Sequence, residues 1–196
     1  MLPGCVLLPR DPEPDRVTLA ADCLDRDDGA GAVVHFTAHV KVHPEQVMFR
    51  AYLAEQLFRL KRFDLAAAHF ERFIADAQPM TGAPHEHLVH CHTRLTTMAA
   101  ARGDGYREGL NRGISLLQLA AGWPDDEQRR MALRKAAGAL REALDERPGC
   151  PRAYYYLAMV YERLGQPASA EAARTAARNG PPCVLTEFEK AQLLGK

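Results

Sequence analysis

The chain has 196 residues, 47% of them hydrophobic, with 25 basic and 25 acidic side chains and therefore no formal net charge. This composition is ordinary for a folded globular protein and excludes a globally disordered chain. The balanced charge also gives no reason to expect nucleic acid or an anionic membrane as a partner.

No stretch contains the roughly 18 apolar residues that a transmembrane helix needs, so we expect none. The five cysteines are odd in number and widely spaced, at Cys5, Cys23, Cys91, Cys150 and Cys183. This pattern favours free thiols in a reducing compartment over a disulfide framework, and it predicts a cytoplasmic protein. Residues 1–14 are expected to form a poorly ordered N-terminal extension.

Two helical hairpins are predicted in the first part of the chain, because their apolar residues recur at helical spacing. The first hairpin is recognisable mainly from Ala32, Phe36 and Pro44. The second lies within residues 48–79 and carries a fuller set, with Leu53, Ala54 and Leu57 on its first helix and Ala66, Phe70 and Phe73 on its second.

The middle of the chain is predicted to be irregular. Apolar residues in helical phase predict one helix over about residues 86–102 and another over about 106–121. A third helix is expected after residues 124–127, because a proline followed by acidic residues favours a helix N-terminus. With these helices, the chain has an odd number of predicted helices before its C-terminal segment, whereas a regular set of pairs needs an even number. We therefore expect the stacking of pairs to be interrupted between Gly103 and Asp126.

The last predicted hairpin carries the clearest repeat pattern. It reads Tyr154-x2-Leu157-Ala158-x2-Tyr161, and it continues through Gly165, Ala170, Ala177 and Pro182. Thr186 and Glu189 then form a capping-box pattern, which predicts the start of another helix. We expect residues 183–196 to form a C-terminal capping helix over the last apolar face of the stack.

These hairpins recur with a common period. Ala32 and Ala66 lie 34 residues apart, and so do Ala136 and Ala170. The period and the residues around it resemble the tetratricopeptide repeat, whose unit has about 34 residues. The resemblance implies an all-α fold, in which residues 15–182 form a right-handed solenoid of helical hairpins that is irregular in the middle. It also implies a protein-binding scaffold and not an enzyme.

The resemblance further implies where a partner binds, because in this family the first helix of each pair lines a concave groove. By motif phase, the groove residues are Tyr52, Glu55, Arg59, His90, Arg94, Thr97, Arg152, Tyr155, Tyr156, Met159 and Arg163. Tyrosine, methionine and arginine are enriched at the centres of protein interfaces. The alternative for Tyr155 and Tyr156 is that they pack between neighbouring helices.

Histidines and one cysteine form the only grouping that suggests a metal site. His85, His87, His90 and Cys91 lie close together, with His87 one helical turn from His90 or Cys91, and His35, His39 and His43 recur every four residues. A structural zinc site needs four ligands and a catalytic one needs three, so a partner helix would have to complete either set. Solvated or capping histidines explain both groups more simply, and we expect no metal or other cofactor.

The remaining motifs for catalysis are missing, since the chain has no phosphate-binding loop, no nucleophile elbow and no complete dinucleotide fingerprint. We therefore expect an adaptor that holds a segment of another protein in its groove. One alternative is a self-associating structural or assembly protein, with the uncovered apolar face of the first repeat as the contact. A second alternative is a metal-responsive regulator that uses residues 85–92.

Overall fold

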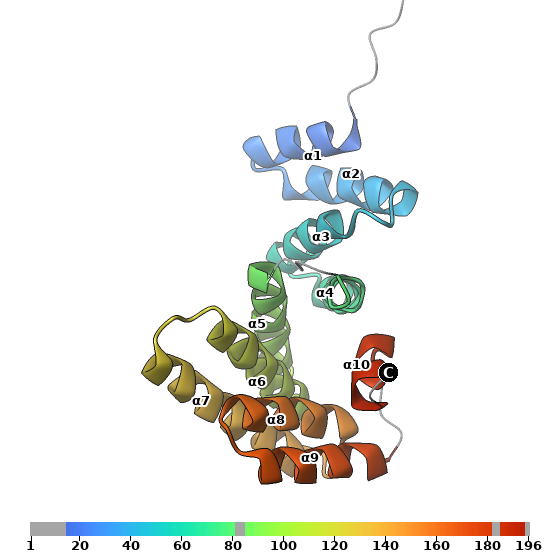
Figure 1. Cartoon of the computed structure of the whole chain (residues 1–196). Coiled ribbons are helices and arrows are strands. Elements are labelled where there is room, and N and C mark those ends of the chain that lie inside the picture. The colour runs from blue at the N-terminus through green and yellow to red at the C-terminus, as the bar shows by residue number, and fades with distance from the viewer. Residues whose placement is uncertain (1–14, 81–84, 182–184, 195–196) are drawn as a thin grey trace, which may run out of the picture.

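A computed structural model of the chain describes residues 15–80, 85–181 and 185–194. In this part, all regular elements are helices: α1 (Arg16–Asp25), α2 (Gly29–Val42), α3 (Val47–Arg59), α4 (Phe63–Ala77), α5 (His85–Ala101), α6 (Gly105–Ala121), α7 (Asp126–Glu146), α8 (Pro151–Arg163), α9 (Pro167–Asn179) and α10 (Glu187–Leu194). They stack from α1 and α2 at one end to α8 and α9 at the other (Figure 1). Among these residues, no helix is both long and apolar enough to cross a membrane. The predicted extension at 1–14 lies outside the described residues.

The helix ends follow local sequence signals. Side chains of Asp15, Asp28, Asp104 and Asp125 accept hydrogen bonds from backbone N–H groups of the first helical turns of α1, α2, α6 and α7. These bonds satisfy donors that have no partner within the helix. Gly103 and Gly165, where the chain leaves α5 and α8, have φ angles of +67° and +71°. Glycine adopts this left-handed conformation without steric cost, so both glycines allow the chain to leave its helix.

The four alanines that define the period are all fully buried: Ala32, Ala66, Ala136 and Ala170. They lie on α2, α4, α7 and α9, where the absence of a larger side chain lets two helices approach closely. By this phase, the repeated hairpins are α1–α2, α3–α4, α6–α7 and α8–α9. The predicted all-helical solenoid is confirmed.

Helix α5 belongs to none of these four hairpins. It completes the buried core of the N-terminal helices through Leu88, Leu95 and Met98, whereas a second core begins with α6. The predicted interruption between Gly103 and Asp126 coincides with α6, which packs against both α5 and α7 instead of belonging to one pair alone.

Two glycines of α6 lie close to α7. A methyl group on Gly109 would lie 2.7 Å from the carbonyl oxygen of Ala139, and one on Gly113 would lie 2.6 Å from Cγ of Leu140. Distances this short do not occur between real side chains and backbone, so glycine is required at both positions. Because the pair is specific to this hairpin, the 34-residue pattern did not indicate it.

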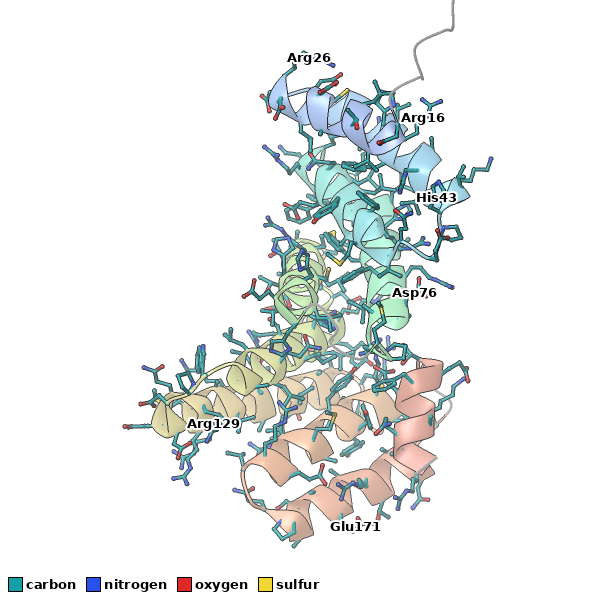
Figure 2. The ribbon with its side chains drawn as sticks, turned by 45° about the horizontal axis from the view of Figure 1, so that its top comes forward. Arg16, Arg26, His43, Asp76, Arg129 and Glu171 are labelled. Carbon is teal, nitrogen blue, oxygen red and sulfur yellow. The ribbon has the colours of Figure 1, made fainter. Side chains whose placement is uncertain are left out.

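The predicted C-terminal helix is present as α10, but it packs against α8 and α9 on the side nearer α4 and does not extend the stack beyond α9 (Figure 1). The predicted capping box is present, because Thr186 Oγ1 accepts from the N–H of Glu189 and Glu189 Oε2 accepts from the N–H of Thr186. Charged side chains cover much of the remaining surface, from Arg26 at one end of the stack to Glu171 at the other (Figure 2).

Candidate protein-binding surface

The predicted groove residues of α3 and α5 come together in one strip along these two helices. Glu55 on α3 accepts two hydrogen bonds from Arg94 on α5, at 2.7 and 3.0 Å, and a third from His90 Nε2 at 2.9 Å. The Arg94 guanidinium also lies over the Phe58 ring, 4.6 Å from its centre. These contacts fix the two helices side by side and hold the charged groups in place.

The strip extends in both directions along the helices. On α3, Tyr52 is 43% exposed and its ring meets His87 of α5 edge-on, at a centroid distance of 6.3 Å. Arg59 follows Glu55 by one turn and is exposed. Thr97, also exposed, follows Arg94 on α5 and donates its hydroxyl hydrogen bond to the Thr93 carbonyl. We call these six residues the α3–α5 strip: Tyr52, Glu55, Arg59, His90, Arg94 and Thr97.

The tyrosines predicted from α8 do not line an open surface. Tyr155 and Tyr156 are both buried, with their rings edge-on at 5.0 Å. The Tyr156 hydroxyl donates to Glu189 of α10 at 2.6 Å and accepts from Gln78 Nε2 at 2.9 Å. Burial and the neighbouring Glu189 raise the pKa of Tyr155 to about 12. Both tyrosines therefore pack between helices, which is the alternative given for them above, and Tyr156 is also bonded to α10.

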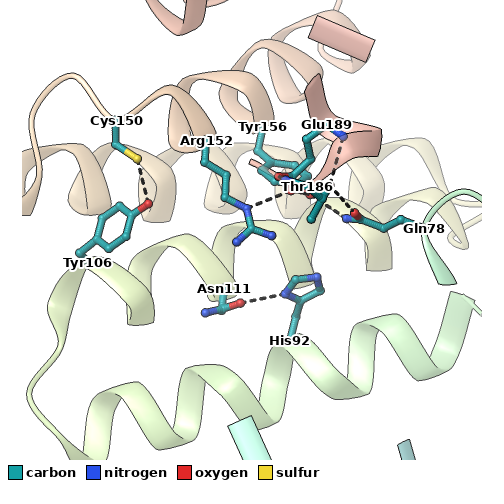
Figure 3. A network of polar contacts seen from close by, with 9 residues as sticks. All are labelled: Gln78, His92, Tyr106, Asn111, Cys150, Arg152, Tyr156, Thr186 and Glu189. Atoms are coloured by element: carbon teal, nitrogen blue, oxygen red, sulfur yellow. Dashed lines mark hydrogen bonds and ion pairs between the residues drawn. The ribbon is translucent and has the colours of Figure 1, made fainter. Parts of the chain in front are cut away.

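The other three predicted residues of α8 also hold the fold together. Arg152 donates from Nε to the fully buried carboxylate of Glu189 at 2.9 Å (Figure 3). Arg163 donates to the Leu117 carbonyl at the end of α6. Met159 is half-buried and packs against the C-terminal core. The predicted site is therefore divided: its α3 and α5 residues lie on one surface, Tyr155 and Tyr156 are buried, and Arg163 is exposed near the end of α6.

The candidate metal ligands face different neighbours. His85 contacts the Gln118 carbonyl, His87 packs on Tyr52, and His90 pairs with Glu55. Cys91 is buried, and burial together with Glu55 raises the pKa of its thiol to about 12. His39 binds Gln46 and stacks near His43, while His35 contacts Arg16. Within the described part of the chain, no three histidine, cysteine or acidic side chains converge on one point.

The sequence reasoning missed a second group of polar residues around His92. This histidine is buried, and its Nδ1 lies 2.9 Å from Asn111 Oδ1 of α6 (Figure 3). Burial lowers its pKa to about 4, and the charge of Arg152 acts in the same direction, although the bond to Asn111 opposes them. His92 shares a helix face with Leu88 and Leu95, and that spacing could have indicated a core position.

With the geometry established, comparison with known proteins identifies the repeats. A family model described as tetratricopeptide repeat matches residues 19–80 and 127–182, which is more than half of the chain. The chain belongs to the tetratricopeptide repeat family. The unmatched residues between these segments contain α5 and α6, where the solenoid is irregular. Proteins of this family generally act as protein-interaction scaffolds, and this tetratricopeptide repeat protein is a scaffold of that general kind.

Solved structures with similar folds are distant in sequence. A crystal structure of MamA protein shares 14% identity, covers 90% of this chain and 92% of its own, and gives a TM-score of 0.43. TTC0263, a thermophilic TPR protein of Thermus thermophilus, shares 16% identity over 91% of this chain and 79% of its own, with a TM-score of 0.39. No curated protein matches the sequence.

Proposed function

We propose that the protein is an adaptor that holds a segment of a partner protein on the α3–α5 strip. The observation that carries this proposal is the bridge from Glu55 to Arg94 and His90, which joins polar side chains of two helices into one continuous surface. Preorganised side chains cost less entropy on binding than free ones, so such a surface is suited to recognition. In this proposal α10 takes no part in binding.

The chemistry of the strip favours a segment with an acidic side chain next to an apolar one. Arg59 is exposed and forms no ion pair with any described residue, whereas Arg94 is paired with Glu55. Tyr52 offers an exposed aromatic ring whose position is fixed by contacts with Phe36 and Phe49. An arginine beside a partly exposed tyrosine is typical of the energetic centre of an interface.

Affinity capture from the native host with three baits tests the proposal. The baits are the parent chain, a strip variant with Tyr52→Ala and Arg59→Glu, and a control variant with Met131→Ala and Arg130→Glu. The control residues are exposed on α7, away from the strip. We expect a protein that the parent and the control recover and the strip variant does not. Equal recovery by all three baits would remove the strip from the binding surface.

A second copy of the chain is the other candidate partner. Val34 and Val42 on α2 are 63% and 69% exposed, more than any other large apolar residue of the described chain. Exposed apolar residues at the end of a repeat stack favour end-to-end association. Light scattering of the parent and of a Val34→Asp, Val42→Asp variant separates the two functions. A mass that rises with concentration only in the parent would support self-association, and a constant monomer mass would support the adaptor.

We also propose that the protein works in a reducing compartment, the cytoplasm. Cys23 and Cys91 are buried thiols outside any disulfide, which is the state that such a compartment maintains. Fractionation of host cells with an antibody against the chain tests this assignment.

A further inference from the structure

A cavity of about 640 Å³ opens between α4, α5, α6 and α8, beside the residues that lead into α10. Its volume lies within the range of roughly 300–1,000 Å³ that is usual for small-molecule sites. Apolar side chains such as Ile74, Leu95 and Leu110 form part of the wall. The cavity lies apart from the α3–α5 strip, because no residue of the strip contributes to its lining.

Two arginines supply uncommitted hydrogen-bond donors to this cavity. Arg152 uses Nε for Glu189, and its two terminal nitrogens, which have no partner among the described residues, point toward the space between Asn111 and His92 (Figure 3). Arg147 lies over the ring of Tyr106, 4.1 Å from its centre, and forms no ion pair within the described part of the chain. The aromatic ring holds its guanidinium at the cavity wall and leaves its N–H groups available.

The charge of the lining is positive. Four arginines, Arg72, Arg107, Arg147 and Arg152, contribute to the wall, and Glu71 is the acidic residue among the described lining residues. Arg72 and Arg107 are partly neutralised by Asp76 and Asp104. Arg152 is paired through Nε with Glu189, so its terminal nitrogens and the guanidinium of Arg147 are the donors left for a ligand. The planar guanidinium group binds carboxylate and phosphate oxygens in pairs, so these donors suit an organic anion.

The arginines need a hydrogen-bond acceptor from a ligand, whereas His92 needs a hydrogen-bond donor. Asn111 donates from Nδ2 to the Arg107 carbonyl at 2.9 Å, which turns its Oδ1 toward His92. The Nδ1 of His92 must therefore carry the proton and donate, and its Nε2 carries the lone pair. This Nε2 is buried in the cavity wall and has no hydrogen-bond partner in the described structure. An acceptor in that position needs a donor from the ligand, since an anionic oxygen there would be repelled.

We propose that this cavity binds a small organic anion, with a carboxylate or phosphate on Arg147 and Arg152 and a hydroxyl or N–H group that donates to His92 Nε2. The anion and the donor are separate groups on the same ligand, because the arginines and the histidine offer opposite hydrogen-bonding roles. An apolar body would contact the aliphatic part of the wall.

Isothermal titration of the full chain with three probes tests this site. Malate and succinate differ by one hydroxyl group, and glycerol 3-phosphate carries a phosphate together with hydroxyls. We expect saturable binding of malate or of glycerol 3-phosphate, and the tighter of the two identifies the anionic group. Malate should bind roughly fivefold more tightly than succinate, the difference made by one neutral hydrogen bond. Equal affinity for malate and succinate would overturn the role given to His92.

A pair of arginine variants provides the control. Arg147→Gln removes a guanidinium at the cavity, while Arg130→Gln removes an exposed one on α7 that is not part of the lining. We expect Arg147→Gln to weaken binding by roughly tenfold or more and Arg130→Gln to leave it unchanged, with both variants melting near the parent. The proposal is overturned if none of the probes binds saturably to the parent, or if Arg147→Gln binds as tightly as the parent.

Discussion

Glu189 connects a local sequence signal with long-range packing. Its backbone and one carboxylate oxygen complete the capping box with Thr186, and its other oxygen accepts from Arg152 and Tyr156 of α8. The capping box could be predicted because its partners are three residues apart. The contacts with α8 could not, because they join residues 37 and 33 positions apart in the chain.

Replacing Glu189 with Gln should release α10 from α8. The change removes the fully buried carboxylate that pairs with the half-buried guanidinium of Arg152, and breaking such an ion pair costs about 3 kcal/mol. We therefore expect amide hydrogen exchange in α10 to become roughly a hundredfold faster, as measured by mass spectrometry. Glu187→Gln is the matched control, because that carboxylate is exposed on the same helix and should leave the exchange rate nearly unchanged.

His92 should make the stability of the fold depend on pH. Its folded-state pKa of about 4 lies below the unfolded value of 6.5, so the unfolded chain takes up the proton first as the pH falls. Its contribution is fully present above pH 6.5 and is lost between pH 6.5 and 4. We expect the free energy of unfolding in urea to fall by about 2 kcal/mol between pH 7 and pH 5. His92→Gln should lose most of this dependence and His87→Gln should keep it; an unchanged dependence in His92→Gln would show that other groups cause it.

At the scale of elements, helix positions were the most predictable feature. The predicted helices at 86–102 and 106–121 correspond to α5 and α6 within one residue at their ends, because apolar periodicity and glycine stops are local signals. The pairing of these helices was less predictable. It depends on which helix fits against Ala136, and that fit rests on Gly109 and Gly113, which lie outside the 34-residue pattern.

A pair of glycine substitutions should separate close packing from helix propensity. Gly109→Ala puts a methyl group 2.7 Å from the Ala139 carbonyl and 3.0 Å from the Ala143 nitrogen, which are backbone atoms of α7 that move only with the helix. We expect a loss of about 1–3 kcal/mol in the free energy of unfolding. At Gly138 of α7 an added methyl group meets no neighbouring atom within 4 Å, so Gly138→Ala should stabilise the protein by up to about 1 kcal/mol. Urea denaturation measures both, and equal effects would contradict the close approach of α6 and α7.

At the scale of the whole molecule, the predicted partner-binding face is covered by another helix near α8 and is open near α3. Helix α10 occupies the face of α8 that family resemblance assigned to a partner, and Thr186 also reaches Gln78 at the end of α4. No corresponding helix lies over Tyr52 and Arg59 in the described structure. Motif phase could therefore predict that the α3 and α5 residues lie at the surface, but not that Tyr155 and Tyr156 are buried, because motif phase does not show where a terminal helix docks.

The difference between the two halves gives the most direct test of the adaptor function. Once a partner segment has been identified, its dissociation constant is measured for the parent, Tyr52→Ala and Tyr155→Ala, together with their melting temperatures. Truncating a tyrosine at an interface centre costs about 2 kcal/mol, or roughly thirtyfold in affinity. We predict this loss for Tyr52→Ala with little change in melting, and for Tyr155→Ala a clearly lower melting temperature with affinity retained while folded. Parent-like affinity in Tyr52→Ala, with weakened binding in folded Tyr155→Ala, would contradict the α3–α5 strip as the binding surface.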